Sequence, residues 1–508
     1  MRTKYSIINA ITAVAFQIIN ILIVFVSRRI FLAELGATCL GINSLFTQML
    51  SMLSLVELGV GQAIVFSLYK PLAENDEEQI SAIMQLYRKV YTAVGGIIFL
   101  IGAGLTPFIK LFISGDISEI NNIYLVFMLY VINTSLTYFS AYKQNLFIAD
   151  QRKYITIFYH GGLFVLTNIF QIVVLLTTHD FIVYLLLQVF FTVLENILLS
   201  KKTKRAYPYI EKNKKAIVHA ETLQIMKKNV GALMAHKIGG VVVNSTDALI
   251  ISMCIGIVTV GKYTNYAYVV NAFLTLASQL FGSVTASVGN YNVNKPDEVE
   301  TIFNHFNYFN FALFGIISIC SFGLFNDFIG VVYGKGMLLE SGVVFLMVVR
   351  LYVNGMRYSL TTFKSAAGIY YPDRYRPLLE SAINLIVSVV LAKRYGLAGV
   401  IIGTIACMVL ADLTIEPHVV YKYIFHKKSK DYYKRYLLFI CAVMLMMPLS
   451  YMFSTHIVTS FGKMFIKGIC LLVISIIYVL IIGWIFCKED LKYFLKLLEN
   501  VLKRGDRK

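Results

Sequence analysis

Five polar residues share one face of a predicted apolar helix, and their types suit the binding of an anion. Arg350, Asn354, Arg357, Thr361 and Lys364 are spaced by alternating steps of four and three residues, which places them on one side of an α-helix. By helix rise alone, Arg350 lies about 18 Å from the external end of this helix, slightly past the middle of a bilayer. Guanidinium groups bind phosphate and carboxylate oxygens through paired hydrogen bonds. Arg350, Arg357 and Asn354 are therefore candidates for holding an anionic substrate.

A second interpretation applies to Arg357 and Lys364, which lie nearer the predicted cytoplasmic end of the helix. Long basic side chains often extend along a helix so that their charge reaches the lipid headgroups. Both interpretations stay open for these two residues. For Arg350, near the middle of the bilayer, the cost of a lipid-facing charge favours a cavity.

The predicted helix 230–254 carries His236, Lys237, Asn244 and Asp247. His236 and Asp247 are three helical turns apart and share a face, whereas Lys237 and Asn244 lie on an adjoining face. One possibility is a buried Lys237–Asp247 pair with a purely structural role. The other is a cavity lining in which Asp247 or His236 takes up a proton or a sodium ion.

Three further charges lie in or beside the first two predicted apolar helices. Glu57 is a lone carboxylate in the second, and we include it among the candidates for ion coupling. Arg28 and Arg29 end the first helix on its external side, where interfacial anchoring or a place in an outward-open cavity would explain them. Taken together, the intramembrane charges predict a cavity with net positive charge, which suits an anionic substrate.

The composition indicates that these residues belong to a membrane protein. Of the 508 residues, 58% are hydrophobic and 15% are charged, and the mean hydropathy is +0.70. A soluble surface normally requires about a quarter of the residues to be charged. Apolar windows of about 20 residues recur along the chain, too long for the strands of an outer-membrane barrel. We predict an all-α integral membrane protein with about 14 transmembrane helices, near residues 6–26, 41–66, 90–112, 122–141, 155–177, 181–199, 230–254, 263–285, 306–326, 339–360, 378–393, 397–420, 436–454 and 464–486.

Most of the 46 Lys and Arg residues fall on one side of the membrane if both termini are cytoplasmic. This positive-inside bias predicts cytoplasmic N- and C-termini, and it explains the net charge of +18 without a nucleic-acid partner. The seven cysteines form no C-x-x-C pair, and no phosphate-loop, dinucleotide or nucleophile motif stands in a suitable context. We therefore expect no enzyme activity, no cofactor and no metal, and a multi-pass protein of the bacterial cytoplasmic membrane.

An internal repeat organises the chain. An offset of 220 residues aligns Gly36 and Gly41 with Gly256 and Gly261, at the turn between the first two spans of each half. An even number of spans in each half predicts a parallel repeat, with two six-helix bundles in the same orientation. The predicted domains are an N-terminal six-helix bundle (1–200), a basic cytoplasmic linker (201–228), a C-terminal six-helix bundle (229–425), two additional transmembrane helices (426–487) and a cytoplasmic amphipathic tail (488–508).

Two short segments carry a family resemblance. Arg28-Arg29 through Leu35-Gly36, continued by the LGINSL run from Leu40, and the ELGVGQA run from Glu57 resemble lipid-linked oligosaccharide flippases. These form the polysaccharide transporter (Wzx-like) family of the multidrug/oligosaccharidyl-lipid/polysaccharide exporter superfamily. The layout of two six-span bundles plus two spans is similar over nearly the whole chain.

The resemblance implies a flippase that moves a polyprenyl-pyrophosphate-linked oligosaccharide across the cytoplasmic membrane for capsule, exopolysaccharide or O-antigen synthesis. It implies that glycan lipid and membrane lipids as partners, with a polysaccharide polymerase and export machinery beyond them. Arg350 and Arg357 would hold the pyrophosphate, with Lys237, Arg28 and Arg29 as further contacts. The rivals are a cation-coupled multidrug exporter, a peptidoglycan-precursor (lipid II) flippase and a membrane-embedded polysaccharide polymerase.

Overall fold

The computed structural model of the chain is helical, and its described residues contain no strand. Ten helices in this part are long and apolar enough to cross a membrane, and one further apolar helix, Ile238–Cys254, is shorter. The prediction of an all-α membrane protein is thereby confirmed. Fourteen crossings and cytoplasmic termini stay predictions. The structure describes residues 2–57, 60–118, 120, 122–213, 216–369 and 371–505.

Contacts divide the chain into two units, residues 1–261 and 262–508. The division predicted from the repeat begins the second bundle at residue 229 instead. A contact division reports which segments pack together, whereas a sequence repeat reports internal similarity. The predicted domain boundaries therefore stay a prediction.

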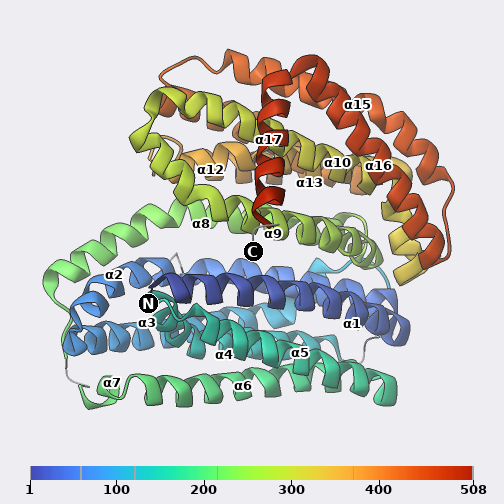
Figure 1. The fold of residues 1–508 in the computed structure, drawn as a ribbon. Helices are drawn as coiled ribbons and strands as arrows, with labels where there is room; N and C mark the ends of the chain where they lie inside the picture. The colour runs from blue at the N-terminus through green and yellow to red at the C-terminus, as the bar shows by residue number, and fades with distance from the viewer. Residues whose placement is uncertain are drawn as a thin grey trace. The chain divides into compact units, whose positions relative to one another are not determined.

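In the first unit, α4 packs against both α3 and α6, while α1 packs against α5 and α8. The long helices α1, α4 and α5 run side by side along the unit (Figure 1). Its helices are α1 (Arg2–Leu53), η1 (Ser54–Glu57), α2 (Val60–Glu74), α3 (Glu77–Leu105), η2 (Thr106–Phe112), α4 (Ile123–Ala149), α5 (Lys153–Thr178), α6 (Phe181–Ala206), α7 (Tyr209–Lys212) and α8 (Ala220–Cys254).

Two glycines that the repeat aligns, Gly36 and Gly256, both adopt a positive φ. Gly36 interrupts α1 at a φ of 78°, and Gly256 lies between α8 and α9 at a φ of 139°. Residues with a side chain rarely adopt this conformation, because Cβ then clashes with the backbone. The turns predicted at these two glycines are thereby confirmed.

The other aligned pair, Gly41 and Gly261, permits a close backbone approach. A Cβ atom on Gly41 would lie 2.1 Å from the carbonyl oxygen of Ile257, and one on Gly261 would lie 3.0 Å from that of Ala37. The amide of Ile257 is fixed in turn, since it donates a hydrogen bond of 2.9 Å to the carbonyl of Ser114. A side chain at position 41 would therefore require the backbone at Gly41 or at Ile257 to shift, at a cost in free energy.

We expect Gly41→Leu to destabilise the protein strongly. Forcing extra carbon into a packed contact typically costs about 1–3 kcal/mol, and here the opposing atoms belong to the backbone. The measurement is the fraction of detergent-solubilised protein that stays monodisperse on size exclusion after a heating series. Gly104→Leu is the matched control, because a Cβ at Gly104 meets nothing within 4 Å. Equal heat resistance of the two variants would contradict the close approach.

In the second unit, α10 is the central helix and packs against α11, α15 and α16. The stretch Arg376–Phe425 holds two predicted crossings, and Gly396, at a φ of 56°, divides it between them. The helices are α9 (Ile257–Asn294), which begins in the first unit, η3 (Pro296–Glu298), α10 (Val299–Tyr333), η4 (Lys335–Met337), α11 (Ser341–Met356), α12 (Tyr358–Ala366), α13 (Arg376–Cys407), η5 (Met408–Asp412), α14 (Leu413–Val420), η6 (Tyr421–Phe425), α15 (Lys430–Thr455), α16 (Phe461–Phe486) and α17 (Lys488–Gly505).

A buried ion pair attaches the last two long helices to the bundle. Lys467 of α16 pairs with Asp327 of α10, and both side chains are buried. The same carboxylate accepts a hydrogen bond of 2.9 Å from the amide of Val458, in the turn between α15 and α16. One carboxylate of α10 therefore holds both the start of α16 and the turn that precedes it.

The predicted amphipathic tail forms α17, which lies across the long helices of this unit (Figure 1). Its start packs on α10: Leu491 is buried, and the rings of Phe494 and Phe309 lie 5.5 Å apart. Asp490 anchors it, because this carboxylate accepts a hydrogen bond of 2.6 Å from Arg435 of α15 and lies 2.7 Å from His305 of α10. The first turns of α17 thus pack on protein, and contact of the tail with the membrane surface stays a prediction.

Candidate functional site

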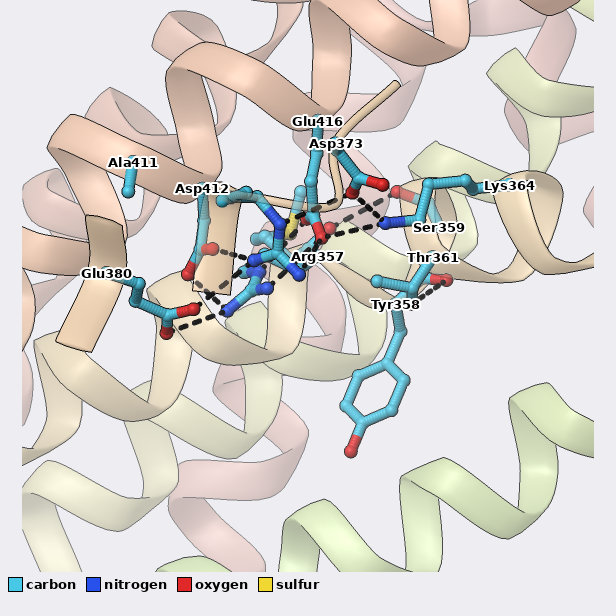
Figure 2. A network of polar contacts seen from close by, with 12 residues as sticks. Arg357, Tyr358, Ser359, Thr361, Lys364, Asp373, Glu380, Ala411, Asp412 and Glu416 are labelled. Atoms are coloured by element: carbon cyan, nitrogen blue, oxygen red, sulfur yellow. Dashed lines mark hydrogen bonds and ion pairs between the residues drawn. The ribbon is translucent and has the colours of Figure 1, made fainter. Parts of the chain in front are cut away.

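Seven charged side chains meet inside the second unit. Figure 2 shows Arg357 at the centre, with Glu380 and Asp412 on one side and Glu416 and Asp373 on the other. The side chain of Arg357 is only 16% exposed and those of Asp412 and Glu416 are at most 1% exposed. We call this group the buried charge cluster; its members are Arg357, Lys364, Asp373, Arg376, Glu380, Asp412 and Glu416.

The central arginine lies where two helices join. The span predicted for 339–360 comprises α11, which ends at Met356, and the start of α12, which begins at Tyr358. Arg357 lies between them, and its amide donates to the carbonyl of Asn354 at 3.3 Å. Its φ of −71° and ψ of −20° are helical, so α11 and α12 continue one another through Arg357.

A local widening of the helix after α13 positions the two acids that face Arg357. Residues 408–412 form the π-helix η5, a turn with one extra residue that rotates everything after it around the helix axis. Asp412 ends this turn, and Glu416 follows four residues later on the same side. Pro417 has no amide hydrogen to donate to the carbonyl of Leu413, and the hydroxyl of Tyr433 donates to that oxygen instead at 2.9 Å.

Arg357 binds its carboxylates with both ends of the guanidinium. Its Nε donates to Glu416 Oε2 at 3.1 Å, and an Nη donates to Glu416 Oε1 at 3.2 Å. The other Nη forms an ion pair with Asp412 and lies 3.9 Å from Glu380. Such paired geometry is the strongest mode of arginine–carboxylate recognition.

Two other cations complete the buried charge cluster. Arg376, the first residue of α13, pairs with Asp412 and lies 3.3 Å from Glu380. Lys364 Nζ lies 2.5 Å from Asp373 and 3.6 Å from Glu416. Cation and carboxylate therefore alternate throughout, as burial in a low-dielectric interior requires.

The buried charge cluster holds three cations and four carboxylates. With every group ionised it would carry one net negative charge. The net positive charge predicted for a cavity lined by all the spans together stays a prediction. The charges of Arg357 and Lys364 are offset by carboxylates from elements that follow them in the chain.

The other two predicted residues of this face lie outside the buried charge cluster. Arg350 sits in α11, half-buried, and donates a hydrogen bond of 2.5 Å to the hydroxyl of Tyr263 in α9. Asn354, one turn further along α11, is also half-buried. Their use as anion contacts stays a prediction.

The candidate carboxylate of the first unit, Glu57, lies at the break between α1 and α2, in η1. Glu57 accepts a hydrogen bond of 2.6 Å from the hydroxyl of Tyr91, and Asn145 donates to that same hydroxyl at 3.4 Å. A Cβ on Gly61 would lie 2.6 Å from the oxygens of both Glu57 and Tyr91. Gly61 therefore gives the carboxylate and the phenol the room in which they meet.

Arg28 and Arg29 differ although they are neighbours. Arg28 is buried, 3.4 Å from the hydroxyl of Ser44, whereas Arg29 is exposed. Asp247, in α8, is buried as well. The side chains of His236, Lys237 and Asn244 lie outside the described residues, so the predictions that involve them stay predictions.

Asp373, Arg376, Glu380, Asp412 and Glu416 are the charged residues that sequence reasoning passed over. The signal was present: Asp412 and Glu416 stand four residues apart within a predicted span, directly before Pro417. Two carboxylates on one face of an apolar helix require compensating cations nearby. Which cations those are could not be read from the sequence, because they lie some 36 to 59 residues upstream.

We expect Arg357→Ala to lower the midpoint of thermal unfolding strongly, because it leaves four buried carboxylates facing two cations. Removing one partner of a buried ion pair typically costs about 3–5 kcal/mol. The measurement is thermal unfolding of purified protein in detergent, with exposed Arg29→Ala as the control. Adding Glu416→Ala restores the original net charge and should recover part of the loss. A double variant no more stable than Arg357→Ala would contradict this charge account.

No protein-family model and no curated protein sequence matches the chain. Solved structures do match. An inward-facing multidrug resistance MATE family transporter of the MOP superfamily matches with a TM-score of 0.63 at 13% identity. The match covers 81% of this chain and 98% of the transporter. The lipid II flippase MurJ, in an inward closed conformation, matches with a TM-score of 0.61 at 14% identity. That match covers 92% of this chain and 98% of the flippase.

A further match is the MATE transporter VcmN of Vibrio cholerae. Its TM-score is 0.52 at 12% identity, and the match covers 82% of this chain and 93% of that protein. At such low identity these likenesses establish the fold alone. The chain therefore has the fold shared by these MATE transporters and the lipid II flippase.

Proposed function

We propose that this protein is a flippase that moves an oligosaccharide linked to polyprenyl pyrophosphate across the bacterial cytoplasmic membrane by alternating access. Capsule, exopolysaccharide or O-antigen assembly would use the product, in concert with a polymerase and export machinery. The observation that carries this proposal is the extent of the fold match. The lipid II flippase covers 92% of the chain and the MATE transporter 81%, a difference about the size of α15 and α16 together.

The proposed substrate needs an anion site inside the membrane, and Arg350 is our first candidate for it. It lies in α11, seven residues before Arg357 and therefore on the same face of the predicted helix. Its hydrogen bond to Tyr263 holds the guanidinium in one position, so that less rotamer entropy is lost when an anion binds. Asn354 lies next to it along the helix.

Arg357 has a different place in this proposal. Its guanidinium is engaged by Glu416 and Asp412, so drawing it towards a pyrophosphate would leave buried carboxylates uncompensated. We therefore treat Arg357 as a residue that ties the end of α11 to Asp412 and Glu416 and so supports the position of Arg350. In the first unit, Arg28 is the second anion candidate, with Arg29 and Lys237 as weaker ones.

The driving force would be a membrane potential or an ion gradient. Glu57, Asp247 and His236 are the candidate residues for coupling transport to it. Glu57 accepts a hydrogen bond of 2.6 Å from the hydroxyl of Tyr91 and lies in η1, between α1 and α2. A carboxylate in such a position can exchange a proton or a cation as the helices around it rearrange.

A cation-coupled multidrug exporter is the second candidate function. The four carboxylates of the buried charge cluster and the TM-score of 0.63 to a MATE transporter favour it. Every one of those carboxylates already binds a cationic side chain of this protein and so is not available to bind a cationic drug. For this reason the flippase is the preferred proposal. A lipid II flippase would differ in the glycan alone.

We expect Arg350→Ala to reduce flipping by about tenfold or more, because a charge-assisted contact to a phosphate contributes roughly 1.5–3 kcal/mol. The assay uses proteoliposomes with a polyprenyl-pyrophosphate-linked oligosaccharide and follows glycan that becomes accessible to an impermeant glycosidase. Lys463→Ala, an exposed cation of α16, is the control and should flip normally. Arg350→Lys keeps the charge without the paired geometry and should fall between them. Full activity of Arg350→Ala would exclude this residue from the anion site.

A further inference from the structure

The loop between α12 and α13 carries an arginine that stacks against two tyrosine rings. The guanidinium carbon of Arg374 lies 3.9 Å from the centre of the Tyr371 ring and 4.6 Å from the centre of the Tyr375 ring. Both rings are exposed, Tyr371 to 74% and Tyr375 to 65%. We call Tyr371, Arg374 and Tyr375 the loop triad. Contact with two rings holds the guanidinium in place, because an aromatic face attracts a cation.

Stacking leaves the positive charge of Arg374 uncompensated. A guanidinium has five N–H groups at its edge, and a ring against its face does not occupy them. One of them donates to the carbonyl of Tyr371 at 3.2 Å, and the hydroxyls of Tyr375 and Tyr371 also interact with the guanidinium. All of these partners are neutral, so a negative charge is still required to balance the cation.

The acids nearest to the loop triad in the sequence are engaged elsewhere. The stretch from α12 through the loop to the end of α13 contains two acids, Asp373 and Glu380. Both are buried in the buried charge cluster, where Asp373 pairs with Lys364 and Glu380 lies 3.3 Å from Arg376. Among the described residues, no carboxylate forms an ion pair with Arg374.

The elements that pack against α12 and α13 also lack a free acid. These elements include α10, α11, η5 and α14. Their acids are Glu300, Asp327, Asp412 and Glu416. Glu300 pairs with Lys427. Asp327 pairs with Lys467, and the other two acids belong to the buried charge cluster.

An apolar face continues from the loop triad along α13. Tyr375 directly precedes this helix, and Leu379, Ile386 and Val390 follow it at steps of four, seven and four residues, which places them on the same side. All three apolar side chains are exposed, in a stretch apolar enough to cross a membrane. Such a face contacts lipid chains, and tyrosines at its end are typical of the level of the headgroups.

Interfacial anchoring explains only part of the loop triad. Arg394, near the other end of the predicted span 378–393, is exposed and lies 5.7 Å from the ring of Tyr395 alone, as a simple anchor would. Arg374 differs because it contacts two rings and follows Asp373, which binds Lys364 in the interior. A ligand on Arg374 would therefore hold the exposed side of a loop whose buried side Asp373 already holds.

We propose that the loop triad binds the headgroup of an anionic phospholipid, with the acyl chains along the exposed face of α13. The edge of the Arg374 guanidinium would donate paired hydrogen bonds to the phosphate oxygens. One uncompensated positive charge matches the single negative charge of phosphatidylglycerol. The bound lipid would stabilise the loop and, through Asp373, the buried charge cluster. This inference does not depend on which substrate the protein transports.

The test titrates the full-length protein in detergent with phosphatidylglycerol and counts bound lipid by native mass spectrometry. We expect saturable binding that Arg374→Ala weakens by about tenfold or more, since a charge-assisted contact is lost. Arg374→Lys keeps the charge without the planar fork and should fall between the two. Arg394→Ala is the matched control and should bind as wild type does. Equal affinities of wild type and Arg374→Ala, or an equal loss in Arg394→Ala, would overturn the inference.

Further arms test the two rings and the identity of the ligand. The double variant Tyr371→Ala/Tyr375→Ala keeps the charge but not the stacking, and it should also bind more weakly than wild type. Equal binding of zwitterionic phosphatidylcholine, or displacement of the lipid by excess inorganic phosphate, would overturn the assignment to an anionic lipid. Phosphatidylglycerol should raise the midpoint of thermal unfolding of wild type and Arg394→Ala but not of Arg374→Ala. An equal rise in all three proteins would contradict stabilisation through this loop.

Discussion

The compensation of buried charge determines the structure of the second unit. Arg357 and Arg376 bring guanidinium groups into an interior from which water is largely excluded, and each is stabilised only because carboxylates lie against it. The π-helix η5 and Pro417 are departures from a regular α-helix, and the acids Asp412 and Glu416 lie beside them.

The same constraint separates the roles of residues that look equivalent in the sequence. Arg350 and Arg357 lie on one face of one predicted helix, yet Glu416 and Asp412 hold Arg357 in the buried charge cluster, and Arg350 lies outside that cluster and donates to the hydroxyl of Tyr263. The positive charge relevant to an anionic substrate is therefore distributed differently from what a count of arginines suggests.

The helices could be predicted because long apolar windows permit no other structure in a bilayer. The turns at Gly36 and Gly256 could be predicted because two halves of the sequence repeat them, and each glycine has the positive φ that such a turn needs. The buried charge cluster could not be predicted from periodicity. Its pairs join residues far apart in the chain. The extra residue of the π-helix η5 also rotates Asp412 and Glu416 around the helix axis, relative to a regular α-helix.

The most direct test of the flippase account compares two substrates in one preparation of wild-type proteoliposomes. One population contains a polyprenyl-pyrophosphate-linked oligosaccharide and is probed with an impermeant glycosidase; the other is loaded with a cationic dye under a proton or sodium gradient. The account predicts that the protein exposes the glycan and leaves the dye inside. Efflux of the dye without movement of any glycan lipid would contradict it and would establish a multidrug exporter of the same fold.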